Sequence, residues 1–137
     1  MLGRVAHHLQ HLQSLPLIVD FYDVSLVDGY NMPVSIFPSG GSGECNAATC
    51  VSDLNQRCPK GQQILRNGTA VACNSACMAF NKPEYCCSGA YRTPETCKPT
   101  GYSKVFKASC PTSYSYAYDD PTSTFTCKEA NYLIRFC

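Results

Sequence analysis

The spacing of hydrophobic residues changes from a helical to a strand-like pattern along the first third of the chain. Apolar residues recur at steps of three and four over residues 1–15, which predicts a short amphipathic helix. From Leu17 to Pro38, β-branched and aromatic residues flank Asp28-Gly29, a pair typical of tight turns. This stretch therefore predicts a strand, a turn and a second strand. A flexible connector follows over Gly40–Gly43.

The segment from Cys45 to Cys110 lacks long periodic stretches, so we expect loops and short helices there. Two stretches favour a helix. The first is Asn74–Phe80, with Asn74 as the N-cap, and the second is Tyr102–Ala108, with Ser103 as the N-cap.

The tail returns to a β pattern. Tyrosines alternate with small residues over Tyr114–Tyr118, which is typical of a strand that packs in a sheet and less typical of a sugar-binding platform. Asp119-Asp120-Pro121 predicts a turn. Thr122–Thr126 and Tyr132–Phe136 are then expected to form strands.

Charge and hydropathy exclude two function classes. The 137 residues include 11 Lys and Arg against 10 Asp and Glu, dispersed along the chain, so nucleic-acid binding is not expected. No apolar stretch approaches the roughly 18 residues of a membrane-spanning helix.

The densest apolar run, Leu15–Val19, contains a proline and ends at Asp20, so no cleavable signal peptide is visible. The length allows one domain, or one domain with a small satellite.

Eleven cysteines lie between Cys45 and Cys137, and this density indicates disulfides formed in an oxidising compartment. Zinc is not expected, because structural zinc sites need closely paired ligands and no Cys-x-x-Cys occurs. The only histidines, His7, His8 and His11, lie far away in sequence, so we predict no metal and no cofactor. The odd count leaves at least one cysteine without a partner in the chain, and the residues alone do not choose the pairing.

Several motifs resemble the thaumatin-like proteins, the osmotin-type, pathogenesis-related family of plants. These motifs are Asp20–Val34, Cys73–Cys77, Glu84–Cys87, Ser113–Cys127 and Asn131–Cys137. The resemblance covers about residues 18–137 and implies a mainly β fold, a flattened β-sandwich beside a disulfide-rich lobe. Residues 17–44 and 111–137 would supply sandwich strands and residues 45–110 the lobe, whereas residues 1–16 resemble nothing in the family.

The resemblance also implies a disulfide pairing. The implied pairs are Cys45–Cys127, Cys50–Cys110, Cys58–Cys73, Cys77–Cys86 and Cys87–Cys97. Cys137 is then unpaired, because its family partner lies near an N-terminus that this sequence lacks. We therefore expect a truncated member, or a gene model with a misplaced first exon, in which strands of an incomplete sandwich expose apolar side chains. A monomer is expected, although Cys137 could join two copies.

The family's acidic cleft, between sandwich and lobe, is lined by an arginine, a glutamate and three aspartates. Matching by motif places two aspartates at Asp23 and Asp28 and the third in Asp119-Asp120, where we favour Asp120. Without the resemblance, Asp23 and Asp28 would be taken for a solvated strand residue and a turn former. The arginine and glutamate have no counterpart here, so we expect no catalytic residue, although some relatives cleave β-1,3-glucan.

The function implied by the resemblance is plant defence through binding of β-1,3-glucan or other fungal surface components. The alternatives are a truncated product without independent activity and an inhibitor-type module that binds microbial hydrolases. The resemblance implies a secreted protein, located in the apoplast or vacuole. Asn67-Gly68-Thr69 is an N-glycosylation sequon in a polar loop, and it matters if the chain enters the secretory pathway.

Overall fold

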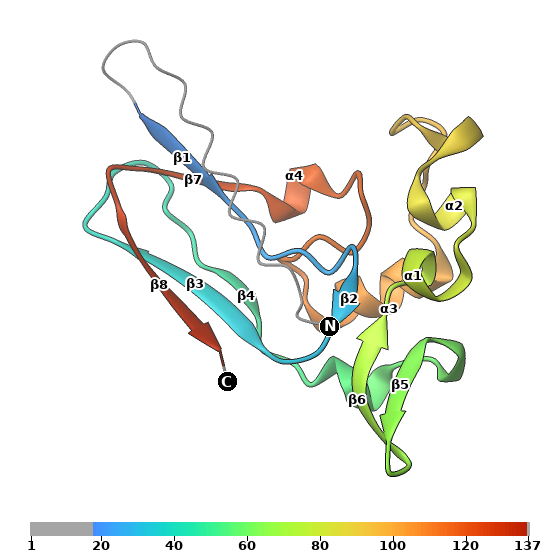
Figure 1. Ribbon diagram of the computed structural model, residues 1–137. Helices are drawn as coiled ribbons and strands as arrows, with labels where there is room; N and C mark the ends of the chain where they lie inside the picture. The colour runs from blue at the N-terminus through green and yellow to red at the C-terminus, as the bar shows by residue number, and fades with distance from the viewer. Residues whose placement is uncertain (1–17, 137) are drawn as a thin grey trace.

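The computed structural model describes residues 18–136, which form three small antiparallel sheets joined by short helices (Figure 1). The expected mainly β fold is confirmed. The first sheet pairs β1 (Val19–Tyr22) with β7 (Phe125–Lys128). The second has the order β4 (Ala48–Cys50), β3 (Val34–Ser39), β8 (Asn131–Phe136). The third has the order β2 (Gly29–Tyr30), β6 (Thr69–Asn74), β5 (Gln63–Arg66). The helix expected over residues 1–15, and Cys137, lie outside the described residues.

Short helices fill the chain between the sheets. The α-helices are α1 (Ala76–Phe80), α2 (Pro83–Cys86), α3 (Gly101–Ser109) and α4 (Asp120–Ser123). The 3₁₀ turns are η1 (Leu54–Arg57), η2 (Lys60–Gln62) and η3 (Gly89–Tyr91). No helix of residues 18–136 is long and apolar enough to cross a membrane.

The strands around Asp28-Gly29 form, but they do not pair with each other. The turn is closed by the Gly29 amide, which donates to the Leu26 carbonyl at 2.9 Å. β1 pairs with β7, β2 with β6 and β3 with β8, so the partners come from distant parts of the sequence. The strands do not pair with each other because Val24 and Leu26, between β1 and β2, are buried in the core, at 2% and 3% exposure.

The two helices expected in the lobe form as α1 and α3, but their caps differ from the expected residues. Asn74 is the last residue of β6, paired with Gly29, so Ser75 caps α1 by accepting from the Met78 amide at 3.2 Å. Thr100 caps α3, and Ser103 closes a capping box from the third helical position. The expected caps Asn74 and Ser103 were therefore wrong.

The tail differs from its β pattern. Tyr114–Tyr118 forms turns and bends, with a single bridge to Ser25, and is not a strand. The turn expected at residues 119–121 is the start of α4, where Pro121 suits the first helical turn. β7 therefore begins only at Phe125. The strand expected over Tyr132–Phe136 is confirmed as most of β8.

The glycine-rich connector is fixed. Ser42 and Lys128 exchange two backbone hydrogen bonds, of 3.0 and 2.9 Å. A Cβ atom on Gly41 would lie 2.6 Å from the sulfur of Cys127, so the chain passes too close to the Cys45–Cys127 disulfide for any side chain. The connector expected to be flexible over Gly40–Gly43 therefore has long-range contacts at Gly41 and Ser42.

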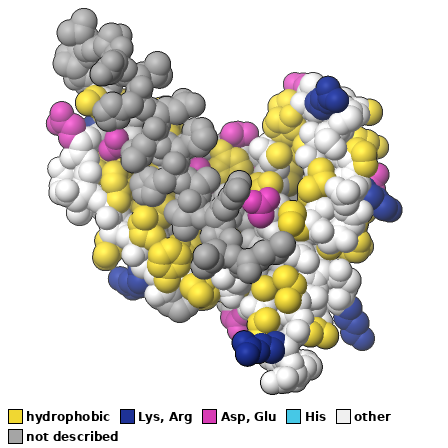
Figure 2. Space-filling model, in the orientation of Figure 1, with side chains coloured by type: hydrophobic (Ala, Val, Ile, Leu, Met, Phe, Trp, Pro, Cys, Tyr) yellow, Lys and Arg dark blue, Asp and Glu magenta, His cyan; other side chains and the backbone are white. Residues whose placement is uncertain are grey.

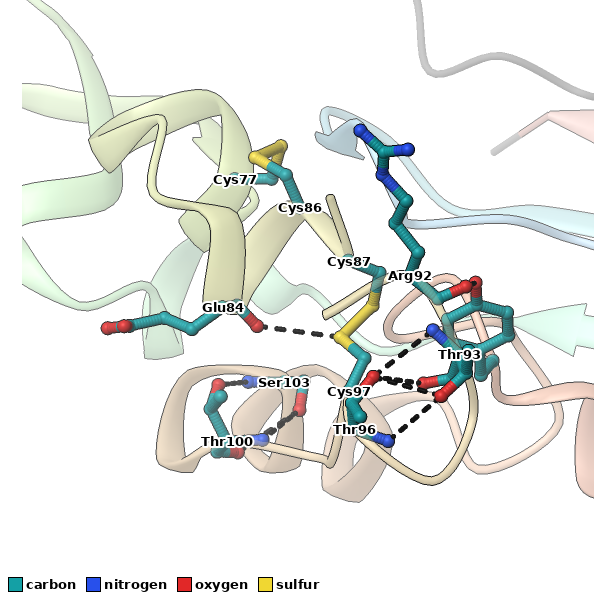
Figure 3. The surroundings of a disulfide bond; sticks show 11 residues. Cys77, Glu84, Cys86, Cys87, Arg92, Thr93, Thr96, Cys97, Thr100 and Ser103 are labelled. Carbon is teal, nitrogen blue, oxygen red and sulfur yellow. Dashed lines mark hydrogen bonds between the residues drawn. A yellow bond between two sulfur atoms is a disulfide. The ribbon is translucent and has the colours of Figure 1, made fainter. Parts of the chain in front are cut away.

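Five disulfides join ten cysteines in the pairs that the resemblance implies. Cys45–Cys127 and Cys50–Cys110 close loops of 82 and 60 residues, and they tie the tail to the rest of the chain. Figure 3 shows Cys77–Cys86 and Cys87–Cys97 side by side, with the neighbouring Thr93 and Thr96 joined by hydrogen bonds. The vicinal cysteines thus anchor one point of the lobe to two different segments.

Two strands expected to expose apolar side chains do so. Phe21 of β1 is 50% exposed, and Leu133 and Phe136 of β8 are each 58% exposed. Figure 2 shows hydrophobic side chains over the sheet that contains β3 and β8. These side chains lie outside the buried core, which gathers around Tyr22, Val24 and Phe106.

Candidate functional site

The segment between β1 and β2 carries two of the predicted cleft aspartates. Val24 and Leu26 are buried, whereas Asp23, Ser25 and Val27 are partly exposed, so the alternation places Asp23 on the outward side. The Leu26 amide donates to the Tyr114 carbonyl at 2.8 Å, and the Tyr114 amide donates to the Val24 carbonyl at 2.9 Å. These two bonds hold the Asp23 segment against the tail.

Tyr114 connects this segment to Asp120. Its phenol hydroxyl donates to Asp120 Oδ1 at 2.9 Å and also contacts the Thr124 hydroxyl. Burial, helped by the negative charges of Asp120 and Asp23, raises the pKa of Tyr114 to about 12, although the Thr124 contact acts in the opposite direction. The phenol therefore stays protonated at neutral pH. Two predicted cleft aspartates thus act on one phenol.

Asp28 lies in the turn that precedes β2 and is exposed. The turn is tightly placed, because a Cβ atom on Gly29 would lie 2.5 Å from the Cys73 carbonyl oxygen. Gly29 also has a φ of +123°, a conformation that favours glycine. The packing of Gly29 on β6 therefore fixes where the Asp28 backbone lies.

Asp119 is the aspartate of the predicted set that forms an ion pair with a lysine. One oxygen lies 3.0 Å from Lys107 Nζ and accepts from the Ser115 amide and hydroxyl at 2.9 and 2.8 Å. Burial alone would raise the pKa of Asp119, but the Ser115 bonds and the Lys107 charge lower it overall. This arrangement suits a structural ion pair and favours Asp120 as the aspartate that a ligand can reach. Nothing in the sequence motifs pointed to Lys107 as the partner.

A small pocket of about 20 Å³ lies where the Asp28 turn meets the lobe. It holds about one water molecule and is smaller than a sugar ring. Its lining comprises Val27, Ser75, Ala76, Cys77, Tyr85, Lys98, Thr100, Tyr102, Ser103, Phe106, Ser115 and Tyr116. Figure 2 shows that the surface is hollowed between the part of the molecule with β1 and the lobe, with acidic side chains at the hollow.

Aromatic rings contribute to the lobe side of this region. Tyr85 and Tyr102 line the pocket, and their ring centroids lie 5.5 Å apart in an edge-on arrangement. Phe80 packs on both, at 5.8 and 5.1 Å. The sequence singled out Tyr116 among the alternating tyrosines, but it gave no reason to select Tyr85 or Tyr102, which come together only in the fold. We call Asp23, Asp28, Asp120, Tyr114 and this pocket the acidic hollow.

Residues 18–136 contain no group of three or more His, Cys, Asp or Glu side chains placed to hold a metal ion. Asp23, Asp28, Asp120 and the Tyr114 phenol offer hydrogen-bonding groups, and the pocket that contains the rings is lined by Val27, next to Asp28, and Ser115, next to Tyr114. This combination is suited to a polyhydroxylated ligand.

Comparisons with known proteins give a consistent result. The model of the Thaumatin family matches residues 5–137, which include most of the N-terminal stretch that the motifs alone left unassigned. A thaumatin-like protein of Arabidopsis thaliana is 64% identical over 121 residues, 87% of this chain and 50% of that protein. The pathogenesis-related thaumatin-like protein 3.5 of Cryptomeria japonica is 61% identical over 118 residues, 86% of this chain and 49% of that protein.

A third relative carries an enzyme name. The glucan endo-1,3-beta-glucosidase of Prunus avium is 53% identical over 120 residues, 86% of this chain and 49% of that protein. The chain thus spans about half the length of the curated relatives that it matches.

Proposed function

Because this chain belongs to the thaumatin family, we propose that it is a secreted plant defence protein that binds β-1,3-glucan of fungal walls through the acidic hollow. Two observations support this proposal. Relatives at 61% and 62% identity are named pathogenesis-related proteins, and a relative at 53% identity is named for action on a 1,3-β-glucan. The five disulfides agree with an oxidising, extracellular location.

The observation that carries the proposal is the arrangement around Tyr114. Backbone hydrogen bonds hold the Asp23 segment to Tyr114, and the phenol hydroxyl holds Asp120 at 2.9 Å. Carboxylates fixed in this way accept hydrogen bonds from sugar hydroxyls, and bonds to a charged acceptor are stronger than neutral ones. The Tyr85 and Tyr102 rings offer apolar surface for a sugar face.

Hydrolysis is the second candidate, and the name of the Prunus avium relative favours it. Glycoside hydrolysis normally uses two carboxyl groups, one of them an acid with a raised pKa. The pKa of Asp119 is lowered by its Ser115 and Lys107 contacts, so this carboxyl is a poor proton donor. Asp119 is therefore not suited to supply this acid, and we propose binding without turnover.

A retention assay on insoluble β-1,3-glucan tests binding. The wild-type chain is compared with an Asp23→Asn, Asp28→Asn double variant and with Glu129→Gln. Glu129 is an exposed carboxylate between β7 and β8, outside the acidic hollow, so its variant controls for the loss of a surface carboxylate elsewhere. Cellulose serves as the control polysaccharide, and the release of reducing sugar is measured in the same samples.

The expected result is retention of the wild type and of Glu129→Gln, loss of the double variant, and no release of sugar. Retention of the double variant at the wild-type level would remove the acidic hollow from the account. Sugar release above background that Asp120→Asn abolishes would replace binding by catalysis. A folded wild type that glucan does not retain would support a product without independent activity or an inhibitor-type module.

A further inference from the structure

The sequon Asn67-Gly68-Thr69 forms the turn of the β5–β6 hairpin. Asn67 and Gly68 have φ angles of +50° and +77°, and the flanking Arg66 and Thr69 are paired across the strands. Two central residues with positive φ define the tight hairpin turn for which Asn-Gly is the favoured pair. The sequon, expected in a polar loop, therefore lies at the tip of a defined hairpin.

The tip is open to solvent on all three positions. Asn67, Gly68 and Thr69 are exposed, and a Cβ atom built on Gly68 meets nothing within 4 Å. Figure 1 shows the hairpin projecting from the lobe, with its tip at the far end from α4 and β1. No other part of the described chain therefore competes with a large group attached to the Asn67 side chain.

We propose that Asn67 carries an N-linked oligosaccharide when the chain passes through the secretory pathway. Thr69 completes the acceptor sequence. In the transfer, Asn67 Nδ2 forms a bond to the anomeric carbon of an oligosaccharide carried on a polyprenyl pyrophosphate. The bond from that carbon to the pyrophosphate breaks, the polyprenyl pyrophosphate leaves with the electron pair, and the amide nitrogen loses one proton. No oxidant or reductant takes part.

The position of the tip indicates how the glycan would affect association between chains. β5 is an edge strand of its sheet, and its Leu65 side chain is 57% exposed. Exposed edge strands are sites at which chains associate, and bulky polar groups beside them reduce that tendency. The tip lies at the end of β6 away from Asn74, which pairs with Gly29 beside Asp28, so we expect the modification to leave glucan binding unchanged. This inference is independent of the proposed function.

The test is the mass of the peptide that contains position 67. The full chain is secreted from plant cells behind an added cleavable leader, and its disulfides are verified by the mass of the unreduced protein. The protein is then treated with a peptide N-glycosidase in heavy-oxygen water, which converts a glycosylated asparagine to an aspartate that contains heavy oxygen. Spontaneous deamidation before treatment gives an unlabelled aspartate, and a sample kept in heavy-oxygen water without the enzyme measures deamidation of the Asn-Gly pair during treatment.

Two threonine variants provide the controls. Thr69→Ala removes the acceptor sequence but leaves the Asn-Gly turn intact, and Thr69→Ser retains the acceptor sequence. The proposal predicts a labelled aspartate at position 67 in the wild type and in Thr69→Ser, and none in Thr69→Ala. An unlabelled residue at position 67 in secreted, disulfide-bonded wild type overturns it. So does equal labelling of Thr69→Ala.

Discussion

The ammonium group of Lys107 lies 3.0 Å from a carboxylate oxygen of Asp119, and it also donates to the Ser113 carbonyl at 3.1 Å and the Ser123 hydroxyl at 2.9 Å. One side chain of α3 therefore holds together the two ends of the tail segment that carries Tyr114 and Asp120. We expect this contact to be important for stability, because both partners are largely shielded from water.

Replacing Lys107 by Met is expected to destabilise the fold by about 2–3 kcal/mol, because it leaves the Asp119 carboxylate shielded without its charged partner. Chemical denaturation of the two proteins measures the difference. Lys104→Met is the matched control, since Lys104 is an exposed lysine of the same helix, and it should change the free energy of unfolding by less than about 0.5 kcal/mol. Equal effects of the two variants would show that the Lys107 contact is unimportant.

The same ion pair predicts an acid-sensitive stability. The folded chain lowers the pKa of Asp119 below its ordinary value of 3.8, so folding favours the ionised form. This contribution is present above the ordinary value and is lost as the pH falls through the lower folded-state pKa. The wild type should therefore lose more stability than Asp119→Asn between about pH 4 and pH 2. Parallel curves for the two proteins in that range would contradict the assignment.

Tyr114→Phe removes a hydrogen-bond donor but keeps the ring. We expect retention on β-1,3-glucan to weaken about fivefold, equal to about 1 kcal/mol, because Asp120 loses the bond that orients it. In the wild type, the Tyr114 phenol should ionise near pH 12, which absorbance of the phenolate measures. Folding raises this pKa, so its stabilising effect is present below pH 10 and is lost as the pH rises through about 12. Unchanged retention in the phenylalanine variant would separate Tyr114 from ligand binding.

Gly29→Ala tests how tightly the Asp28 turn is placed. The added Cβ atom would lie 2.5 Å from the Cys73 carbonyl oxygen, in addition to the strain of a positive φ. Gly43→Ala is the matched control, because Gly43 also has a positive φ, of +98°, but a Cβ atom there meets nothing within 4 Å. Both should be destabilised by about 1 kcal/mol of backbone strain, and Gly29→Ala by about 2 kcal/mol more. Equal melting temperatures of the two variants would show that the Asp28 turn adjusts to the added Cβ atom.

A disulfide that closes a long loop should stabilise the fold more than one that closes a short loop. Cys45–Cys127 closes a loop of 82 residues and Cys87–Cys97 a loop of 10. Loop entropy in the unfolded chain then predicts stabilisation of about 4.5 and 2.7 kcal/mol. Denaturation of the Cys45→Ser, Cys127→Ser and Cys87→Ser, Cys97→Ser double variants measures the two values. The opposite order would show that packing of the lobe, and not chain entropy, dominates.

Local patterns predicted those elements that depend mainly on interactions between residues close together in the sequence. The alternation that forms β8 and the Asp28-Gly29 turn were visible in the sequence, because strand propensity and turn chemistry act over a few residues. Asn67-Gly68 is a hairpin signal of the same kind and forms the turn between β5 and β6, where only a polar loop with a sequon is expected.

The remaining features depend on long-range contacts. Tyr114–Tyr118 has a strand-like alternation, but its backbone is held by Val24 and Leu26 of a distant segment and not by a neighbouring strand. The difference between Asp119 and Asp120 arises from Lys107, which no local pattern connects to them. For the same reason, the pocket rings Tyr85 and Tyr102 could be identified only in the fold.

The most direct test of glucan binding at the acidic hollow is a map of backbone amide shifts on titration with a soluble β-1,3-glucan oligosaccharide. The account predicts that amides of Asp23–Gly29 and Tyr114–Asp120 shift together, with one dissociation constant, while those of the hairpin tip, Arg66–Thr69, stay in place. Shifts confined to other residues, or no shifts at all, would contradict it.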